Sequence, residues 1–229
     1  MGDVFSITGR ADIKLYNQDC MPALEAMEEN QFDLAIVDPP YGIGDWTTGT
    51  SVYKDKNGNI NRIKNNLNNT VNWNEDIPSK KYFNILDEKV KNHIIWGANY
   101  YNCFNNGNGA LVWHKGNINP TFSQCEIASL SFQKKVDYVK INWQAGFYRE
   151  KVEGEQIHPC QKPVKLYKWL LKNYAEEGDT ILDTHLGSGS IAIACWDMGF
   201  DLVGYELDED YFEKACKRIK KHTNQMQLF

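Results

Sequence analysis

The chain has 229 residues, of which 42% are hydrophobic, and it carries a net charge of −5 at pH 7. This length and composition exclude a chain too short or too polar to bury a core, and they predict a single domain spanning residues 1–229. No apolar stretch approaches the roughly 20 residues that cross a bilayer. The N-terminus opens no signal peptide, and the six cysteines form no C-x-x-C pair, so we expect a cytoplasmic protein.

Charge is distributed unevenly along the chain. Residues 1–50 carry a net charge of −7, residues 51–172 carry +8 and residues 173–229 carry −6. A positive segment between acidic flanks fits a surface that faces phosphate groups. Ordinary surface lysines would give the same pattern.

Short β-type runs alternate with amphipathic segments, which predicts an α/β fold with a wound sheet. The expected strands are Ile13–Tyr16, Leu34–Val37, His93–Trp96, Ala110–Trp113, Val136–Ile141, Thr180–Leu182 and Leu202–Tyr205. The expected helices are Lys162–Ala175, Ser190–Met198 and Asp208–Lys221. The first and last of these helices each have one apolar face that can cover a sheet, whereas the middle helix is nearly all apolar and should be buried.

The second expected strand ends in the tetrapeptide Asp38-Pro39-Pro40-Tyr41. Prolines donate no backbone N–H and hold the preceding residue extended, so the carbonyl groups of Asp38 and Pro39 cannot return into a helix or a ladder. A carboxylate, a carbonyl and an aromatic ring this close together can accept the hydrogens of a planar amine and stack on the ring that carries it. The tetrapeptide therefore predicts a site for a planar amine or amide.

Residues 44–78 form a polar stretch rich in asparagine, with lysines and an arginine among them. The hydrophobic pattern lapses there, so we expect one long loop. Loops of this length inside compact domains are usually functional or disordered, and the sequence favours neither.

Aromatic side chains are interleaved with lysines and arginines in the positive segment. These aromatic residues are Trp96, Tyr100, Tyr101, Trp113, Trp143, Phe147 and Tyr148. The mixture suits stacking on bases and contact with phosphates. Packing in the core explains most of these residues equally well.

The strand that begins at Thr180 leads into a glycine turn, residues 183–190. The spacing Gly187-x-Gly189-x-x-Ala192 matches the G-x-G-x-x-G/A turn, in which absent side chains let a nucleotide approach the backbone. The next strand ends in Glu206, where an acidic group can accept both hydroxyls of an adenosine ribose. Together these features predict a site for an adenosine-containing ligand.

The tetrapeptide, the segment His158-Pro159-Cys160-Gln161-Lys162-Pro163, the glycine turn and Glu206 together resemble the amino-methylating DNA methyltransferases that use S-adenosylmethionine. The tetrapeptide precedes the cofactor turn, as in the permuted β class of these enzymes. The resemblance implies a Rossmann-like methyltransferase fold with a mixed, mostly parallel seven-stranded sheet in circularly permuted order. It also implies that the two ends of the chain meet across one cofactor pocket.

The same resemblance implies a mechanism. A base flipped out of the duplex would donate its amine hydrogens to the Asp38 carboxylate and the Pro39 carbonyl, while Tyr41 stacks on its ring and Pro40 keeps the turn rigid. The nitrogen lone pair then points at the sulfonium methyl group, so transfer is direct and in line, without a covalent enzyme intermediate or a metal. Base flipping costs about a few kcal/mol.

The resemblance also assigns cofactor-binding residues. They are Asp19, Cys20, His158, Lys162, Asp183, Thr184, His185, Gly187, Ser188, Gly189 and Glu206. Among them, Asp19 approaches the adenine amine, Glu206 binds the ribose hydroxyls and Lys162 pairs with the methionine carboxylate.

The glycine turn departs from the family pattern Asp-Pro-Phe-x-Gly-Ser-Gly-Thr at three positions. Thr184, His185 and Ser190 stand in place of the Pro, Phe and final Thr. His185 either contacts the cofactor or fills the Phe position by packing.

The leading functional prediction is an N6-adenine DNA methyltransferase, because cytosine enzymes of this type more often begin the tetrapeptide with Ser. The alternatives are N4-cytosine methylation, an RNA or protein-glutamine amino methyltransferase, and a DNA-binding regulator that has lost transfer. The last two are disfavoured by the motif order and by the intact Asp38.

The predicted partner is double-stranded DNA, facing loops at about residues 44–78 and 115–157. Little room remains for a separate recognition domain, so the target should be short or shared by a homodimer. A restriction endonuclease is a further candidate partner.

Overall fold

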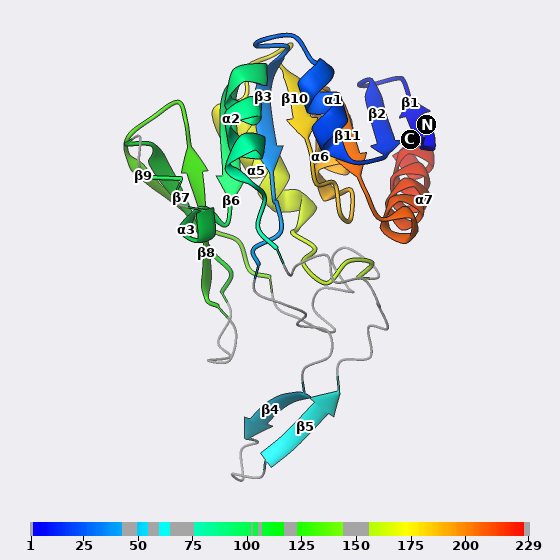
Figure 1. The fold of residues 1–229 in the computed structure, drawn as a ribbon. Coiled ribbons are helices and arrows are strands. Elements are labelled where there is room, and N and C mark those ends of the chain that lie inside the picture. The colour runs from blue at the N-terminus through cyan, green and yellow to red at the C-terminus, as the bar shows by residue number, and fades with distance from the viewer. Residues whose placement is uncertain are drawn as a thin grey trace.

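The computed structural model describes residues 2–42, 50–54, 60–64, 76–101, 103–104, 107–116, 123–143 and 156–226. For residues 50–54, 60–64 and Met226 it describes the backbone only. Figure 1 shows a large twisted sheet with helices on both faces. The main-sheet strands are β1 Val4–Ile7, β2 Ile13–Asn17, β3 Phe32–Val37, β6 Val90–Trp96, β7 Gly109–His114, β8 Cys125–Leu130, β9 Val136–Lys140, β10 Thr180–Asp183 and β11 Asp201–Glu206. The helices are α1 Cys20–Ala26, α2 Lys80–Lys89, α3 Ala98–Tyr101, α5 Val164–Tyr174, α6 Ser190–Met198 and α7 Glu209–Met226.

The main sheet is mixed and mostly parallel, as expected, with the order β1-β2-β11-β10-β3-β6-β8-β7-β9. Strands β2, β11, β10, β3 and β6 run parallel to one another, and β7 runs parallel to β9, whereas β8 is antiparallel to both β6 and β7. The expected number of seven strands is wrong, because the described part of the chain already places nine strands in this sheet.

The two unexpected strands are β1 and β8. Strand β1 lies at the edge of the sheet, antiparallel to β2, and its residues are half-buried or exposed, so no apolar run marks it. Strand β8 has the sequence CEIASL, and its Glu126 interrupts the apolar pattern near the start of the strand. Both strands are therefore held by their neighbours more than by their own sequences.

The Asn-rich stretch also contains regular structure, which corrects the expectation of one long loop. Strands β4 Thr50–Lys54 and β5 Ile60–Lys64 pair antiparallel, with Thr50 opposite Lys64 and Lys54 opposite Ile60. Both runs contain β-branched residues, which favour strands, among the asparagines that suggested a loop.

Helices cover both faces of the sheet and create two core clusters. Helices α5, α6 and α7 pack on one face over Leu34, Leu111 and Ile181, and α1 and α2 pack on the other over Ala35, Val37 and Leu182. Because β3 and β10 are buried on both sides, their sequences are nearly continuous apolar runs.

The three expected helices are confirmed, with small differences at their ends. Helix α6 has the expected bounds because it begins after Gly189 and ends before Gly199, both in the left-handed region at φ 69° and 79°. Helix α5 begins at Val164, two residues later than expected, because Pro163 is extended at ψ 141°. No helix in the described part of the chain is long and apolar enough to cross a membrane.

Strands β2 and β11 pair in parallel, with Tyr16 opposite Tyr205 and Asn17 opposite Glu206. This pairing joins a strand near the start of the sequence to the last strand that the structure describes, and Figure 1 shows the two strands next to each other in the sheet. The carboxyl ends of β2, β11, β10 and β3 therefore lie along one edge of the sheet, which is where ligands bind in open α/β sheets.

Candidate active site

A cavity of about 600 Å³ lies at this edge. It is lined by Gln18, Asp19, Cys20, Asp38, Pro39, Pro40, Tyr41, His158, Cys160, Gln161, Lys162, Tyr167, Thr184, His185, Leu186, Gly187, Ser188, Glu206, Leu207, Asp208 and Tyr211. The lining combines residues that follow β2 with residues that follow β11, so both ends of the chain contribute to it. Its volume is typical of a pocket for a small ligand.

The structure brings together the tetrapeptide and all but two of the cofactor residues named from the sequence. The exceptions are Asp183 and Gly189, which do not line the cavity. Asp183 is buried behind the glycine turn, where its Oδ1 accepts the N–H of His185 at 3.0 Å. A Cβ on Gly189 would lie 2.9 Å from Ile219 and 3.2 Å from Ala215, so this glycine allows α7 to pack closely.

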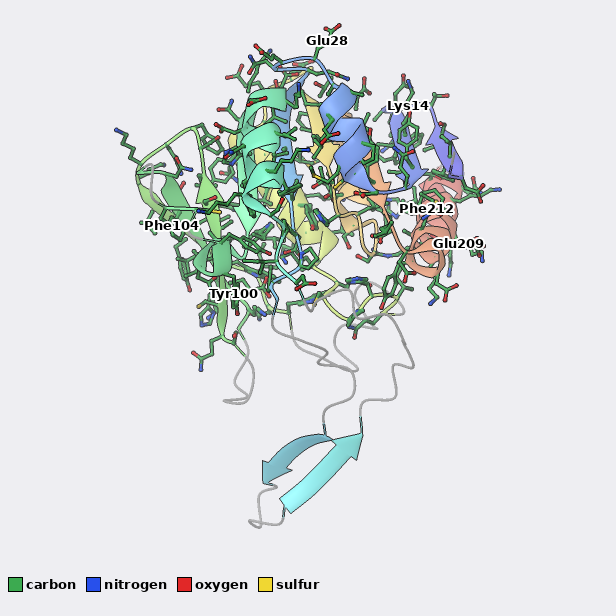
Figure 2. The ribbon with its side chains drawn as sticks, in the orientation of Figure 1. Lys14, Glu28, Tyr100, Phe104, Glu209 and Phe212 are labelled. Carbon is green, nitrogen blue, oxygen red and sulfur yellow. The ribbon has the colours of Figure 1, made fainter. Side chains whose placement is uncertain are left out.

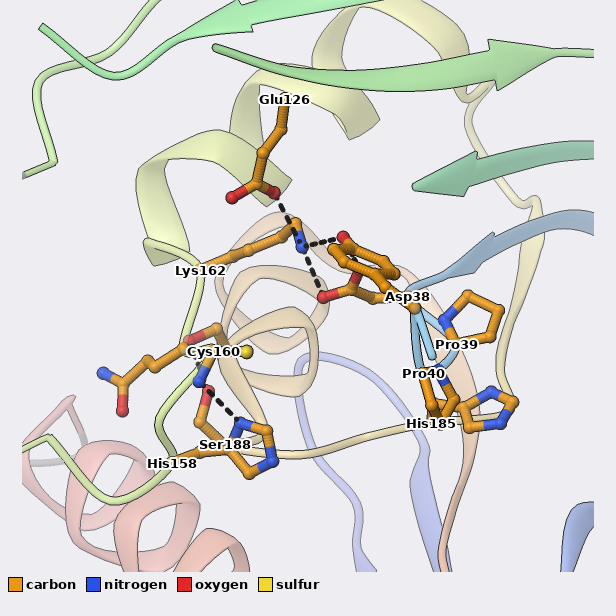
Figure 3. Close-up of polar contacts among 12 residues, drawn as sticks. Asp38, Pro39, Pro40, Glu126, His158, Cys160, Lys162, His185 and Ser188 are labelled. Carbon is orange, nitrogen blue, oxygen red and sulfur yellow. Dashed lines mark hydrogen bonds and ion pairs between the residues drawn. The ribbon is translucent and has the colours of Figure 1, made fainter. Parts of the chain in front are cut away.

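The Asp38 side chain is held by two donors (Figure 3). Lys162 Nζ donates to Oδ2, and the Tyr41 hydroxyl donates to Oδ1 at 2.5 Å. The same Lys162 Nζ lies 3.2 Å from the Tyr41 oxygen and 3.1 Å from Glu126 Oε2. Lys162, expected to pair with the cofactor carboxylate, is thus already paired with two acidic side chains.

This buried cluster shifts the pKa values of its members. Burial raises the pKa of Asp38 above its ordinary value, and the Lys162 ammonium opposes that shift. Burial also disfavours a charged Glu126, but Lys162 and Lys115 together bring the pKa of this carboxyl down to about 2. Lys115 Nζ lies 2.5 Å from Glu126 Oε1, so two lysines and two carboxylates form one ion-pair chain.

The carbonyl groups of the tetrapeptide already have a donor in the structure. The Tyr101 hydroxyl donates to Pro39 O at 2.5 Å and to Pro40 O at 2.6 Å. The sequence predicted that the Pro39 carbonyl accepts a hydrogen bond from a base. In the structure, the hydrogen bond from Tyr101 fixes the orientation of this carbonyl. A carbonyl oxygen has two lone pairs, so the second can still accept a base amine.

The Tyr41 ring is stacked on the ring of Tyr100, with centroids 4.9 Å apart and planes 14° apart. Tyr100 is 41% exposed and extends from α3 at this edge of the sheet (Figure 2). Tyr100 and Tyr101 were named from the sequence only as part of an aromatic set. Of that set, Trp96, Trp113 and Trp143 are core residues, and Phe147 and Tyr148 lie outside the described residues.

The opposite wall of the cavity is formed by the glycine turn and Glu206. Glu206 Oε2 accepts the N–H of Gly187 at 2.7 Å, and Oε1 accepts the N–H of Asp208 at 3.0 Å. Gly187 has φ 53°, which favours glycine, and its Cα faces the His158 ring. Burial raises the pKa of Glu206. On the same side, Asp19 accepts the N–H of Met21 at 2.9 Å and so caps α1.

Two histidines line the cavity in neutral form. Burial lowers the pKa of His158 to about 3 and that of His185 to about 4, so neither carries a charge at pH 7. The His158 ring contacts Tyr211 edge-on, with centroids 4.4 Å apart. His185 packs edge-on against Tyr82, as the packing alternative expects, and it also lines the cavity, so contact with the cofactor stays a prediction.

Sequence reasoning missed Glu126, Lys115, Tyr211 and Asp208 as members of this site. The one available signal for Glu126 was a charged residue in a strand between apolar positions. The segments expected to face DNA, residues 44–78 and 115–157, lie partly outside the described residues, at 44–49, 55–59, 65–75, 117–122 and 144–155.

Comparison with known proteins gives consistent matches. The N6/N4 methyltransferase family, described as DNA methylase, matches residues 32–217. The type II methyltransferase M.HpaI of Haemophilus parainfluenzae is 24% identical, over 93% of this chain and 76% of its own length. M.ScaI of Streptomyces caespitosus is 23% identical, over 94% of this chain and 84% of its own.

Solved structures share the fold. The PvuII DNA methyltransferase, which is cytosine-N4-specific, has a TM-score of 0.59 at 13% identity and covers 93% of this chain and 91% of its own. The complex of M1.HpyAVI with S-adenosylmethionine has a TM-score of 0.55 at 19% identity and covers 90% of this chain and 99% of its own. The match over residues 32–217 shows the family: the chain belongs to the N6/N4 family of DNA methylases.

Proposed function

We propose that this DNA methylase transfers a methyl group from S-adenosylmethionine to the N6 amine of adenine in double-stranded DNA. The observation that carries the proposal is the meeting of Asp38-Pro39-Pro40-Tyr41 with the glycine turn and Glu206 in one cavity. Adenine is preferred over cytosine because the tetrapeptide begins with Asp.

The residues around the cavity fit S-adenosylmethionine. Glu206 presents a buried carboxylate that two backbone N–H groups hold in place, and ribose hydroxyls are donors that such a carboxylate can accept. Asp19 reaches the same cavity from β2 and can accept from the adenine amine. When bound, the cofactor supplies an electrophilic methyl group on a positively charged sulfur.

The tetrapeptide would act on the target base by positioning its amine. Asp38 Oδ1 and the Pro39 carbonyl accept the two amine hydrogens, and the Tyr41 ring stacks on the base. With both hydrogens engaged, the nitrogen lone pair is directed away from the base plane toward the methyl donor. Tyr41 donates to Oδ1 before the base arrives, so base entry must displace that hydroxyl.

DNA recognition is assigned to residues 44–78 and 115–157 of a single catalytic domain that spans the chain. The positive charge of residues 51–172 supports this assignment, because phosphate contacts need lysines and arginines. A homodimer would double the surface available for reading the target, and a restriction endonuclease that cuts the same sequence is the partner expected of a type II enzyme.

The decisive experiment is methylation of plasmid DNA by the purified protein with labelled S-adenosylmethionine, followed by mass spectrometry of the nucleosides. We expect N6-methyladenine, and an Asp38→Ala variant should give none. If the only product were N4-methylcytosine, the adenine assignment would be wrong while the methylase function would stand.

N4-cytosine methylation is the second candidate. It is favoured by the structural likeness to the cytosine-N4-specific PvuII enzyme. The same nucleoside measurement separates the two, since one product or the other must carry the label.

A further inference from the structure

Glu126 brings a second carboxylate to the Lys162 ammonium from a different part of the sheet. It belongs to β8, whereas Asp38 follows β3, and Figure 3 shows Lys162 between the two acids. Lys162 Nζ lies 3.1 Å from Glu126 Oε2 and donates to Asp38 Oδ2. The Lys162 side chain is 4% exposed, so water does not replace either partner.

The arrangement treats the two oxygens of Asp38 differently. Lys162 engages Oδ2, while Oδ1 faces Tyr41. Glu126 Oε2 is buried and accepts no hydrogen bond from the residues that the structure describes, so the Lys162 ammonium compensates its charge. The buried ammonium is therefore shared between two half-buried carboxylates.

We propose that Glu126 is a positioning residue for methyl transfer. Lys162 keeps Asp38 ionised and turns its Oδ2 away from the target amine, and Glu126, by sharing the ammonium, limits how far Lys162 neutralises Asp38, so that Oδ1 remains a strong acceptor. This inference rests on the proposed function, and it assigns Lys162 to Asp38 and away from the cofactor carboxylate.

The physical reason lies in how a carboxylate accepts a hydrogen bond. An Asp38 without a nearby cation would take up a proton in this site, and a protonated oxygen facing the amine could not accept a hydrogen bond from it. If Lys162 formed an ion pair with Asp38 alone, the charge of Asp38 would be largely neutralised and the carboxylate would be a weaker hydrogen-bond acceptor. With Glu126 present, Asp38 is neither protonated nor fully neutralised by Lys162.

The titratable and charged groups that act on Asp38 come from several elements. They are Lys162 before α5, Glu126 on β8, Tyr41 of the tetrapeptide, Tyr101 on α3, Cys160 before α5, Tyr167 on α5 and Asp183 on β10. Lys162 is the cation among the groups that act directly on Asp38, and Glu126 is the acid that raises its pKa. Substitution of these two should therefore move the pKa of Asp38 in opposite directions.

The test is the pH profile of single-turnover methyl transfer to duplex DNA. In Lys162→Met, burial acts on Asp38 without opposition, so the acidic limb of the profile should move up by about one pH unit or more. In Glu126→Gln, Lys162 is left to Asp38 alone, so the limb should move down while the plateau rate falls roughly tenfold. Opposite shifts would not arise from two merely structural defects.

Matched variants separate the proposal from its alternatives. Glu213→Gln on α7 also removes one carboxylate, but Glu213 is an exposed partner of Lys217, and its profile should match that of the unchanged protein. Lys162→Arg keeps the charge and should keep the acidic limb near its original position. If Lys162→Met does not fold, Lys162→Arg still tests whether a positive charge at this position sets the acidic limb.

Three results would overturn the proposal. If the acidic limbs of Lys162→Met and Glu126→Gln moved in the same direction, or if the limb of Glu126→Gln did not move, Glu126 would have no positioning role. A raised KM for S-adenosylmethionine with unchanged kcat in Lys162→Met would assign Lys162 to the cofactor. Transfer that survives Asp38→Ala would instead refute the role of the tetrapeptide in the proposed function. That result can be told apart from the other three, which concern only Glu126 and Lys162.

Discussion

The ring of Tyr41 rests directly on the backbone of Gly97. A Cβ on Gly97 would come within 2.6 Å of Tyr41 Cδ1 and closer still to Cε1. Gly97 also has φ 73°, so both its backbone and its missing side chain are needed where β6 leads into α3. The position of the tetrapeptide ring is thus set by a residue outside the tetrapeptide.

Gly97→Ala should displace Tyr41 and lower the single-turnover rate by about tenfold or more, because a small misplacement of a stacking group is costly. Gly107→Ala is the matched control, since Gly107 has φ 71° but a Cβ added there would meet no described atom within 4 Å. Both variants carry the same backbone strain, and only the first meets Tyr41. Equal rates in the two variants would show that the contact is irrelevant to transfer.

Tyr101→Phe removes the hydroxyl that holds the Pro39 and Pro40 carbonyls while keeping the ring. We expect a loss of about 1 kcal/mol in the free energy of unfolding and a slower transfer step, because the Pro39 carbonyl, which we propose receives the amine, loses its fixed direction. Urea unfolding and single-turnover kinetics measure the two effects, with Tyr138→Phe on the exposed face of β9 as control. A faster reaction would mean that Tyr101 competes with the base.

Glu206→Gln should weaken binding of S-adenosylmethionine about tenfold, as measured by isothermal titration calorimetry. A glutamine has the same shape, but its amide nitrogen cannot accept from Gly187 or Asp208, so one backbone N–H loses its partner. Glu209→Gln, on the exposed first turn of α7, removes a nearby carboxylate outside the cavity and should bind normally. Unchanged affinity in Glu206→Gln would contradict the ribose contact.

Asp183 should make the cofactor-free protein less stable as the pH rises. Burial raises the pKa of this carboxyl from 3.8 to about 8, so the folded protein binds a proton that the unfolded chain has released. The free energy of unfolding then falls by up to about 1.4 kcal/mol per pH unit between these values.

Asp183→Asn keeps an oxygen for the N–H of His185 but does not titrate. Its stability relative to the unchanged protein should therefore increase from pH 5 to pH 8 in urea unfolding experiments. Parallel curves over this range would contradict the raised pKa.

Asp197 ties three helices together, because its carboxylate lies 2.5 Å from Lys168 Nζ and 2.7 Å from His222 Nε2. Asp197→Asn should lower the free energy of unfolding by about 1–2 kcal/mol at pH 7. The pKa of Asp197 is below its usual 3.8 despite burial, owing first to Lys168. The difference should thus persist above pH 3.8 and close as the pH falls below it. An equal loss of stability in Glu213→Gln, which breaks an exposed ion pair, would show that the ion pairs of Asp197 contribute no more than a surface pair.

Residues with strong local signals were predictable from the sequence. Helix α6 was expected from its nearly apolar sequence, and β3 and β10 were expected because strands buried on both faces are apolar throughout. The tetrapeptide and the glycine turn were predicted to share one site, and their residues line one cavity.

The partners of Lys162 were not predictable in the same way. Lys162 and Asp38 are 124 residues apart, and Glu126 reaches them only because β8 is inserted antiparallel between β6 and β7. No local pattern encodes such a three-way contact, since it depends on which strands become neighbours. The edge strand β1 was missed for a related reason, because a half-exposed strand needs no apolar run.

The pairing of β2 with β11 has a consequence for how the protein is made. One wall of the cavity is synthesised first, with Asp19 and Cys20, and the facing wall arrives only with Glu206 and Tyr211, which come much later in the chain. A nascent chain on the ribosome therefore carries Asp38 and Tyr41 long before it has a place for the methyl donor. The cavity can be complete only after β11 has been inserted between β10 and β2.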